Sequence, residues 1–322
     1  MPSVSALYEP LIERNIAAIP DAIRAFRDEH GSDETFLAVG RFAVLAYAPS
    51  QHAKHALLSC LAAHVLRDSD DFDDLVVECA IYAAASRQPW SEPPILDPPA
   101  IDDVPVTFDD RISAERWLAA RLGDPNLARD YFAAATYDFE DLGHKLIVSA
   151  AAWRLAPILG EQGRYATLRV GVWEDVAYGG PRYEERGNAL DERVLLERLI
   201  DRMVDEGGSI ESAHAIFLFD AALETGTSKR VCDYLTSLSV APPTSAALSR
   251  SVAAEVGGAT QKPATSSVPI YRLARDYGEC LKAYAVTRRL RERFPEVSVD
   301  RIIAAAHYNL EHAPSFEEWS FA

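Results

Sequence analysis

The sequence predicts an all-α protein, a multi-helix globular bundle with long Pro-rich connecting segments, and three observations carry this prediction. Gly and Pro contribute only 16 and 19 of the 322 residues, while Ala and Leu recur throughout, a composition that favours helices. Apolar residues recur at helical spacing along most of the chain. Alternating strand patterns are scarce, so little of the sequence is suited to a sheet.

The segment from Arg193 to Val204 shows the helical pattern most clearly. Its apolar side chains fall three or four residues apart, whereas Glu197 and Asp201 lie on the opposite face. Ser209 and the Asp124-Pro125 pair supply start signals for two further helices. The same periodicity predicts helices over 7–28, 34–47, 52–67, 72–86, 112–122, 126–135, 139–159, 210–225, 270–292 and 298–312. Tyr165–Val176 alone shows a weak alternating pattern, which predicts two short strands or an irregular linker.

Two proline-rich segments interrupt the helical pattern. Six prolines lie between Gln88 and Val106, and the stretch from Ala241 to Pro269 is rich in Pro, Ser, Thr and Gly. Proline lacks the backbone donor that a helix needs, so both segments are predicted to be connectors, with a mobile lid as the alternative. We interpret 1–322 as one large helical domain, which the two segments would subdivide into 1–87, 107–240 and 268–322.

Composition excludes several classes of protein. The chain carries 49 acidic against 32 Lys and Arg side chains, a formal charge of −17, which would repel a nucleic-acid backbone. No run of 18 apolar residues predicts a membrane span, and the N-terminal residues do not resemble a secretory signal. The four cysteines are dispersed, as expected of reduced core thiols, so we expect a soluble cytoplasmic protein. Walker, GxGxxG and GxSxG motifs are missing, which disfavours nucleotide-dependent and α/β-hydrolase chemistry.

The first candidate site is the string QHAKH. His52 and His55 lie three residues apart on a predicted helix, so both rings could reach one metal ion or one substrate. His64 is half a helical revolution out of phase with them and should face elsewhere. The alternative is a pair of histidines near the start of a helix with no further role.

The second candidate is a pair of acid-x-x-His spacings. Asp141 precedes His144, and Glu211 precedes His214, by three residues each. Ferritin-like di-iron proteins carry two such motifs on neighbouring helices, with one further carboxylate for each. These four residues are therefore the predicted metal ligands, for iron or another transition metal. The extra carboxylates would be Glu115 for the first motif and Glu192 or Glu197 for the second.

Two other patterns are weaker. Asp70, Asp71, Asp73 and Asp74 form a DDxxD motif resembling the magnesium-diphosphate site of class I terpene cyclases, but the second metal motif of that family is missing. The alternative is a helix that Ser69 caps and that begins with acidic residues. Near the C-terminus, Tyr284 could line a polar pocket, and His307 and Glu311 are spaced for a hydrogen bond.

A family resemblance rests on three short strings. APSQHAKHALL, FEDLGHKLI, and SAHAIFLFDAAL followed by YGECLKAY resemble the questin oxidase-like family, whose members are helical, acidic and histidine-containing. The resemblance covers about half of the chain. It implies an oxidative ring opening of a polyketide-type aromatic substrate. Where the family pattern leads us to expect a histidine before the lysine of the last string, this chain has Glu279 and Lys282.

Two hypotheses follow. In the first, the chain is a small-molecule enzyme, an oxidoreductase or oxygenase, with a pocket between helices lined by His52, His55, His144 and His214 as acid–base groups or ligands. In the second, it is a non-catalytic helical scaffold that binds partners through its acidic faces. The enzyme hypothesis requires His144 and His214 to converge, whereas a scaffold leaves them apart. Either is compatible with a homo-oligomer.

Overall fold

The computed structural model describes residues 4–47, 53–86, 108, 110–177, 179–239 and 278–312, and these ranges contain helices and no strand. The predicted all-α class is therefore confirmed. Both proline-rich segments, at 88–106 and 241–269, lie outside the described ranges, as does His52. None of the described helices is both long and apolar enough to cross a membrane.

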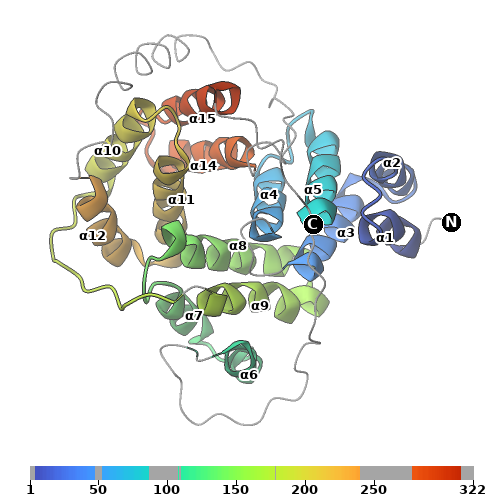
Figure 1. The fold of residues 1–322 in the computed structure, drawn as a ribbon, viewed down its shortest axis with the longest axis horizontal. Coiled ribbons are helices and arrows are strands. Elements are labelled where there is room, and N and C mark those ends of the chain that lie inside the picture. Colours follow the sequence, from blue (N-terminus) through green and yellow to red (C-terminus); the bar gives the residue numbers. More distant parts are fainter. Residues whose placement is uncertain are drawn as a thin grey trace.

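The helices begin and end close to where the apolar pattern placed them (Figure 1). Three helices lie at the N-terminal side of the molecule, and the rest surround a central group of four helices. In chain order they are α1 Val4–Ile12, α2 Ile19–His30, α3 Ser32–Ala46, α4 Ala53–Val65, α5 Phe72–Ser86, α6 Arg111–Arg121, α7 Leu127–Ala135, a short 3-10 helix Asp141–Gly143, α8 His144–Leu159, α9 Glu161–Ala177, α10 Glu192–Asp205, α11 Ile210–Thr225, α12 Ser228–Ser239, α14 Glu279–Arg293 and α15 Asp300–His312.

Some boundaries follow directly from local signals. Helices α5 and α11 have the predicted bounds, and the Ser209 side chain caps α11 by accepting from Ser212 N. The single helix predicted over 7–28 is two helices, because the chain turns at Arg14, which has φ 55°, and restarts with Pro20 in the first turn of α2. Helix α12 was not predicted.

The strand or linker expected over Tyr165–Val176 is wrong, because these residues belong to helix α9. Arg169 and Glu174 are charged but buried, so they interrupt the apolar pattern of the helix. Arg169 pairs with the buried Glu115 of α6 at 2.6 Å, and Trp173 Nε1 donates to the same carboxylate at 2.6 Å. Buried ion pairs of this kind remove the apolar periodicity on which a helix prediction depends.

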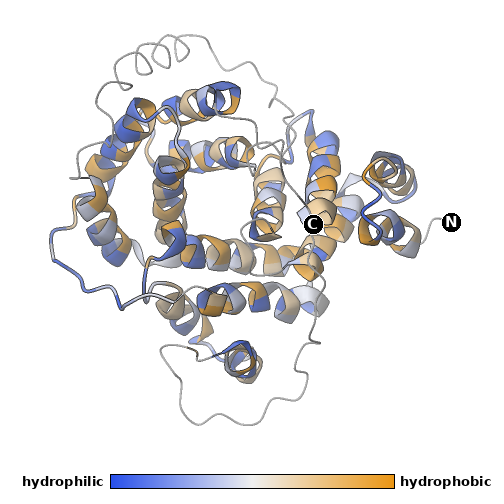
Figure 2. Ribbon diagram, viewed as in Figure 1, coloured by the Kyte–Doolittle hydropathy of each residue, from blue (hydrophilic) through white to orange (hydrophobic). Residues whose placement is uncertain are grey.

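Four helices form a ring at the centre of the molecule. Helix α4 packs against α8, α8 against α11, α11 against α14, and α14 against α4. In Figure 1 their ribbons frame a square, and Figure 2 shows that α4 and α8 carry hydrophobic residues around most of their circumference. Such helices are expected where every face is covered by neighbours. The ring therefore lies inside the fold, and its inward faces can form a site.

Helices α7, α8 and α9 approach one another closely at Gly171. Gly171 of α9 lies against Tyr131 of α7 and Ser149 of α8, and a β-carbon at Gly171 would overlap the Tyr131 hydroxyl. Tyr131 Oη in turn donates to the Leu168 carbonyl at 2.9 Å. Gly163 lies on the same helix, but a β-carbon there would meet nothing closer than 3.8 Å.

We expect the two α9 glycines to respond in opposite directions to alanine. Gly171→Ala should lower the free energy of unfolding by about 1–3 kcal/mol through overpacking. Gly163→Ala should raise it by about 0.5 kcal/mol, because alanine loses less backbone entropy in a helix. Urea unfolding followed by circular dichroism measures both. Equal effects would contradict the packing described for Gly171.

Candidate functional site

The central ring brings titratable side chains together at the N-terminal ends of its four helices. His55 is the third residue of α4, His144 the first of α8, and His214 the fifth of α11, while Glu279 and Lys282 lie in the first turn of α14. We call these five residues the histidine cluster. All five are buried, with exposed fractions between 2% and 5%. Four helix N-termini also direct their partial positive charge at this point.

His144 and His214 form the centre of the cluster. Their Nε2 atoms lie 2.9 Å apart. The other nitrogen of each ring faces a backbone carbonyl: His144 Nδ1 lies 2.6 Å from Asp141 O, and His214 Nδ1 lies 2.7 Å from Ile210 O. A carbonyl oxygen only accepts hydrogen bonds, so both Nδ1 atoms must carry protons.

This arrangement fixes the proton count of the pair. With both Nδ1 atoms protonated, the short Nε2–Nε2 contact is a hydrogen bond only if one further proton lies between the rings. The pair therefore holds three protons and one positive charge. Asp141 Oδ2 lies 3.3 Å from His144 Nδ1, so the charge is best stabilised on His144, and His214 acts as the acceptor.

The turn before α8 positions His144. Asp141, Leu142 and Gly143 have φ values of 51°, 58° and 78°, three successive left-handed residues. The two non-glycine residues store strain of about 1–3 kcal/mol each. A β-carbon at Gly143 would also meet the Leu218 side chain at 2.6 Å. This turn aims the Asp141 carbonyl at the His144 ring.

His55, Lys282 and Glu279 form the second half of the cluster. Lys282 Nζ donates to His55 Nδ1 at 2.8 Å and to Glu279 Oε1 at 2.5 Å. Because Nδ1 of His55 accepts this hydrogen bond, the proton of the neutral ring is on Nε2. The His55 ring meets the His144 and His214 rings edge-on, with centroids 5.3 and 6.2 Å away.

A second set of charged side chains lies next to the histidine cluster. Lys54, buried on α4, donates to Asp141 and, at 3.3 Å, to Glu174 of α9. Tyr47 also donates to Glu174, which is fully buried. Two lysines and the protonated histidine pair thus face three carboxylates, those of Asp141, Glu174 and Glu279. The formal charges cancel, which is the condition for burying this many ions.

The environment shifts the pKa values in a consistent way. Burial lowers the pKa of His55 well below its ordinary value, and the nearby Lys282 charge lowers it further. Burial and the charge of His144 do the same to the pKa of His214. Burial would raise the pKa of Asp141, but hydrogen bonds from His144 and Lys54 outweigh it and lower that pKa. His55 and His214 are therefore neutral, and Asp141 is ionised.

The predicted site residues are only partly assembled. His55, His144, His214 and Asp141 come together as expected, but the predicted metal ligand Glu211 is exposed at the start of α11. It occupies the first turn, where an acidic residue favours the helix N-terminus. Glu279 of α14 is the carboxylate that approaches His214, at 3.9 Å. Glu115 forms an ion pair with Arg169 of α9, and Glu192 forms one with Arg293 at 3.3 Å.

The described residues do not form a metal site. Within these ranges, no three His, Cys, Asp or Glu side chains are arranged to hold a metal ion. The Lys282 ammonium group, which is hydrogen-bonded to His55 and Glu279, would also repel a cation at this point. The di-iron geometry is not formed, because Glu211, Glu115, Glu192 and Glu197 all lie away from the cluster.

The weaker motifs lie elsewhere. Asp70 and Asp74 of the DDxxD motif are exposed, and Asp73 pairs with Arg27 at 3.3 Å. Ser69 does not cap α5 with its side chain, because its hydroxyl has no hydrogen-bond partner among the described residues.

Two further expectations concern the C-terminal residues and the cysteines. His307 is hydrogen-bonded to Tyr284 at 2.8 Å rather than to Glu311, and this pair lies outside the histidine cluster. All four cysteines are buried, and none forms a disulfide among the described residues, as predicted.

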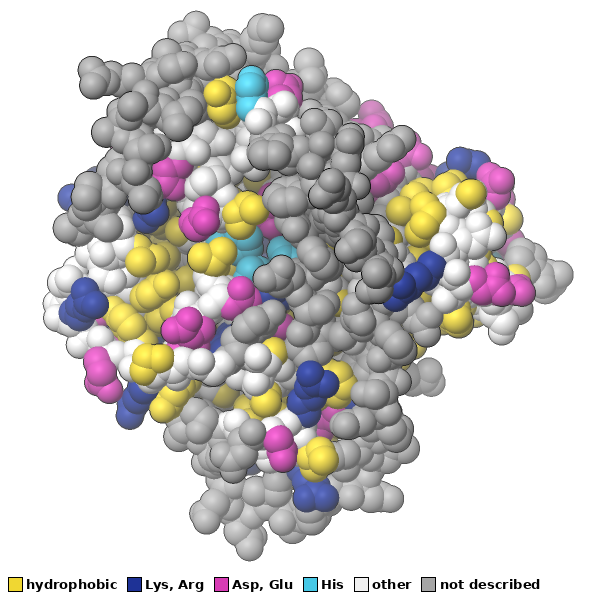
Figure 3. Space-filling model, viewed as in Figure 1, with side chains coloured by type: hydrophobic (Ala, Val, Ile, Leu, Met, Phe, Trp, Pro, Cys, Tyr) yellow, Lys and Arg dark blue, Asp and Glu magenta, His cyan; other side chains and the backbone are white. Residues whose placement is uncertain are grey.

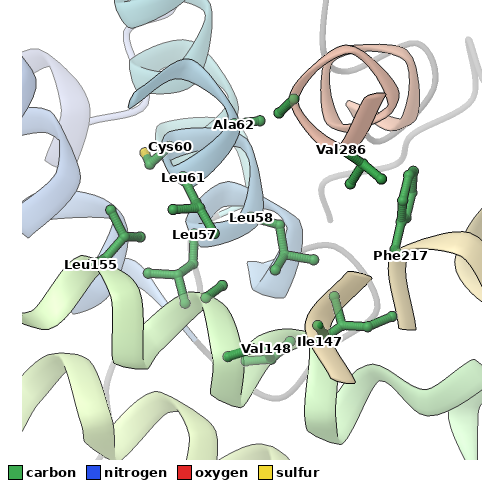
Figure 4. Packing of buried hydrophobic residues seen from close by; sticks show 14 of the residues in the cluster. Leu57, Leu58, Cys60, Leu61, Ala62, Ile147, Val148, Leu155, Phe217 and Val286 are labelled. Atoms are coloured by element: carbon green, nitrogen blue, oxygen red, sulfur yellow. The ribbon is translucent and has the colours of Figure 1, made fainter. Parts of the chain in front are cut away.

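An apolar pocket extends from Lys282 down the middle of the ring. We call it the inner pocket, and Figure 4 shows six of its wall residues on α4, α8, α11 and α14. On each helix, the lining positions follow the cluster residue at helical spacing: three, six, seven and, on α8 and α11, ten residues later, or three, four and seven residues later on α14. Labelled in the figure are Leu58, Leu61, Ala62, Ile147, Phe217 and Val286.

A charged network closes the other end of the inner pocket. Arg154 of α8 pairs with Glu224 of α11 at 2.9 Å, and Arg289 of α14 pairs with Asp220 and, at 3.5 Å, with Glu224. Arg289 lies seven residues beyond Lys282, about 10 Å along the helix axis. The pocket therefore has apolar walls between two polar ends.

Lys54, Glu174, Glu279 and Lys282 were not predicted as site residues. Their partners are remote in sequence: His55 and Lys282 are 227 residues apart. One signal was present, because AKHALLSCLAAHV places a lysine in an otherwise apolar helix, and a buried lysine needs a carboxylate.

Comparisons with protein-family models, with curated proteins and with solved structures give no match. The resemblance to the questin oxidase-like family therefore stays a prediction.

We expect the shared proton between His144 and His214 to be visible by NMR. Histidine-selective ¹⁵N spectra should show protonated Nδ1 atoms in both rings and a strongly downfield Nε2 proton. His214→Gln should remove that proton signal, whereas the control His307→Gln, outside the cluster, should leave it unchanged. An unprotonated Nδ1 in either ring would contradict the proton count.

A carboxyl group next to Glu174 makes stability depend on pH. Neither carboxyl oxygen of Asp175 has a hydrogen-bond partner among the described residues. Burial raises the pKa of Asp175 well above its ordinary value, Lys145 opposes the shift, and Glu174 and Asp138 add to it. The unfolded chain therefore ionises Asp175 at a lower pH than the folded chain does.

We expect this carboxyl group to reduce stability as the pH rises. The loss begins near the unfolded-state pKa of about 3.9 and continues through the higher folded-state value. Asp175→Asn should raise the free energy of unfolding at pH 8 and have little effect at pH 3.5. Urea unfolding at both pH values measures this, and a variant that is less stable at pH 8 would contradict it.

Proposed function

We propose that the chain is a small-molecule enzyme whose histidine cluster stabilises, by hydrogen bonds and positive charge, an anion that forms on a substrate in the inner pocket. The observation that carries this proposal is the position of Lys282. It is hydrogen-bonded inside the cluster and also lines the inner pocket, so its ammonium group can contact a molecule bound there. Its Nζ lies 5.6 Å from the centroid of Phe217, another wall residue.

The protonation state of the cluster suits this role. Lys282 presents an ammonium group to the pocket, and the neighbouring His144–His214 pair supplies a proton that can move between the rings. In surroundings of low dielectric, such donors stabilise a developing oxyanion more strongly than water does. A phenol or an enolisable ketone would therefore lose its proton more readily in the inner pocket than in solution.

The resemblance to the questin oxidase-like family narrows the proposal to an oxidation. A phenolate or enolate is richer in electrons than its parent acid and reacts more readily with an oxidant. Dioxygen is the oxidant that we propose, and the substrate would be a hydroxylated aromatic compound. Two electrons would pass from the ionised dihydroxy-aromatic ring to dioxygen, which would leave a quinone, and the two protons lost by the substrate would pass through the cluster to the reduced oxygen to form hydrogen peroxide.

The scaffold alternative explains the cluster less well. Burying ionised groups costs stability, and apolar residues of the same size would hold the ring together equally well. A protein with only a structural role has no need of two buried lysines beside three histidines. Their retention in the ring favours a chemical role.

The phenol 4-nitrophenol tests the proposal, because its phenolate is coloured. We expect the pKa of bound 4-nitrophenol to fall by about one unit or more, equivalent to about 1.4 kcal/mol of preference for the anion. Lys282→Met should abolish the shift. The control Arg198→Met, which removes an exposed cation on α10, should leave it unchanged. Spectrophotometric pH titrations with and without protein measure the difference.

Three results would contradict parts of the proposal. An unshifted pKa of the bound phenol would remove anion stabilisation. Oxygen uptake that is absent for hydroxylated naphthalenes and anthraquinones would remove the oxidation while leaving acid–base chemistry. Near-stoichiometric iron in the purified, untagged protein, measured by elemental mass spectrometry, would replace the proton-donor role with a metal-ligand role.

A further inference from the structure

A second hollow lies on the other side of Arg154. We call it the outer groove, and it is formed by α7, α8 and the turn from α11 into α12. It is larger than the inner pocket, and the two share Ala150, Arg154 and Glu224 in their walls. The Arg154–Glu224 ion pair therefore separates a narrow apolar pocket from a wider hollow.

The walls of the outer groove combine aromatic rings with positive charge. Phe132 and Trp153 contribute ring faces, with centroids 5.4 Å apart. Four basic side chains line the groove against two acidic ones, whereas acidic residues predominate in the chain as a whole. On the face drawn in Figure 3, acidic and basic side chains are intermingled.

Most of these charges are already paired. Arg129 pairs with Asp130 at 2.8 Å. Arg230 binds the carbonyls of Thr136 and Tyr183, each at 2.7 Å, and pairs with Glu185. These contacts make Arg230 a structural residue of the groove.

Lys229 differs from the other cations. It is exposed in the first turn of α12 and forms no ion pair or hydrogen bond with any other residue that the structure describes. The N-terminal end of α12 adds partial positive charge beside it. Lys229 is thus the cation that a ligand in the groove could neutralise.

We propose that the outer groove is a binding site for an amphipathic organic anion, whose apolar body lies on Phe132 and Trp153 and whose charge faces Lys229. The field of a protein with a net charge of −17 repels anions from most of its surface, so a local excess of positive charge defines where one can bind. This inference is independent of the reaction proposed for the histidine cluster, because it concerns binding without turnover.

Two fluorescent probes of nearly the same shape test the inference. 8-Anilinonaphthalene-1-sulfonate carries a negative charge, and N-phenyl-1-naphthylamine lacks the sulfonate. In fluorescence titrations of the full chain at low salt, we expect the anionic probe to bind more tightly. Lys229→Glu should weaken it by about fivefold or more, because the charge that faces the sulfonate is reversed. Affinity for the neutral probe should not change.

A matched charge reversal controls for the field of the whole protein. Arg198→Glu changes the net charge by the same amount at an exposed position of α10, outside the groove, and should leave both affinities within about twofold. Trp153→Leu should weaken both probes, because it removes an apolar wall. Equal affinities of the two probes for the native chain would overturn the inference. So would an unchanged affinity of the anionic probe for Lys229→Glu, or equal effects of the two charge reversals.

Discussion

The structure depends on the cancellation of charge at the centre of the four-helix ring. Lys54, Lys282 and the protonated His144–His214 pair face three carboxylates in a space that excludes most water. Removal of any one member would leave an uncompensated buried charge, which typically costs about 3–5 kcal/mol. Because the members come from α4, α8, α9, α11, α14 and the turn before α8, this condition also determines how those elements pack together.

The helical repeat explains why chemistry and binding lie next to each other. Each ring helix presents its cluster residue in its first or second turn, and the residues three, four and seven positions later lie on the same face. The face that begins with His214 continues through Phe217 to Glu224, and the face that begins with Lys282 continues to Arg289. One face of each helix thus supplies a proton-handling end, apolar walls and a charged far end.

The sequence predicted what local patterns determine. The bounds of α11 followed from Ser209 and an apolar repeat, whereas the convergence of His144 and His214 was a condition of the enzyme hypothesis that the sequence left open. Helix α9 was missed because Arg169 and Glu174 are buried ions. Glu279, and not the predicted Glu211, is the carboxylate near His214, for a related reason. Glu211 interacts favourably with the N-terminus of its own helix, whereas Glu279 pairs with Lys282. The position of that pair beside His214 depends on tertiary contacts, which spacing along one helix does not encode.

The two polar ends of the inner pocket differ in the charge that they offer to a ligand, and this difference would orient a bound molecule. At the far end, Arg154 and Arg289 are matched by Asp220 and Glu224, so no charge is left for a ligand. At the near end, the balance includes a proton that can move between His144 and His214. A substrate that ionised there by passing its proton to the cluster would leave the total charge of the site unchanged, so no counter-ion would need to enter. The acid–base capacity of the pocket therefore lies at the N-terminal ends of the ring helices, and the opposite end serves as a neutral boundary with the outer groove.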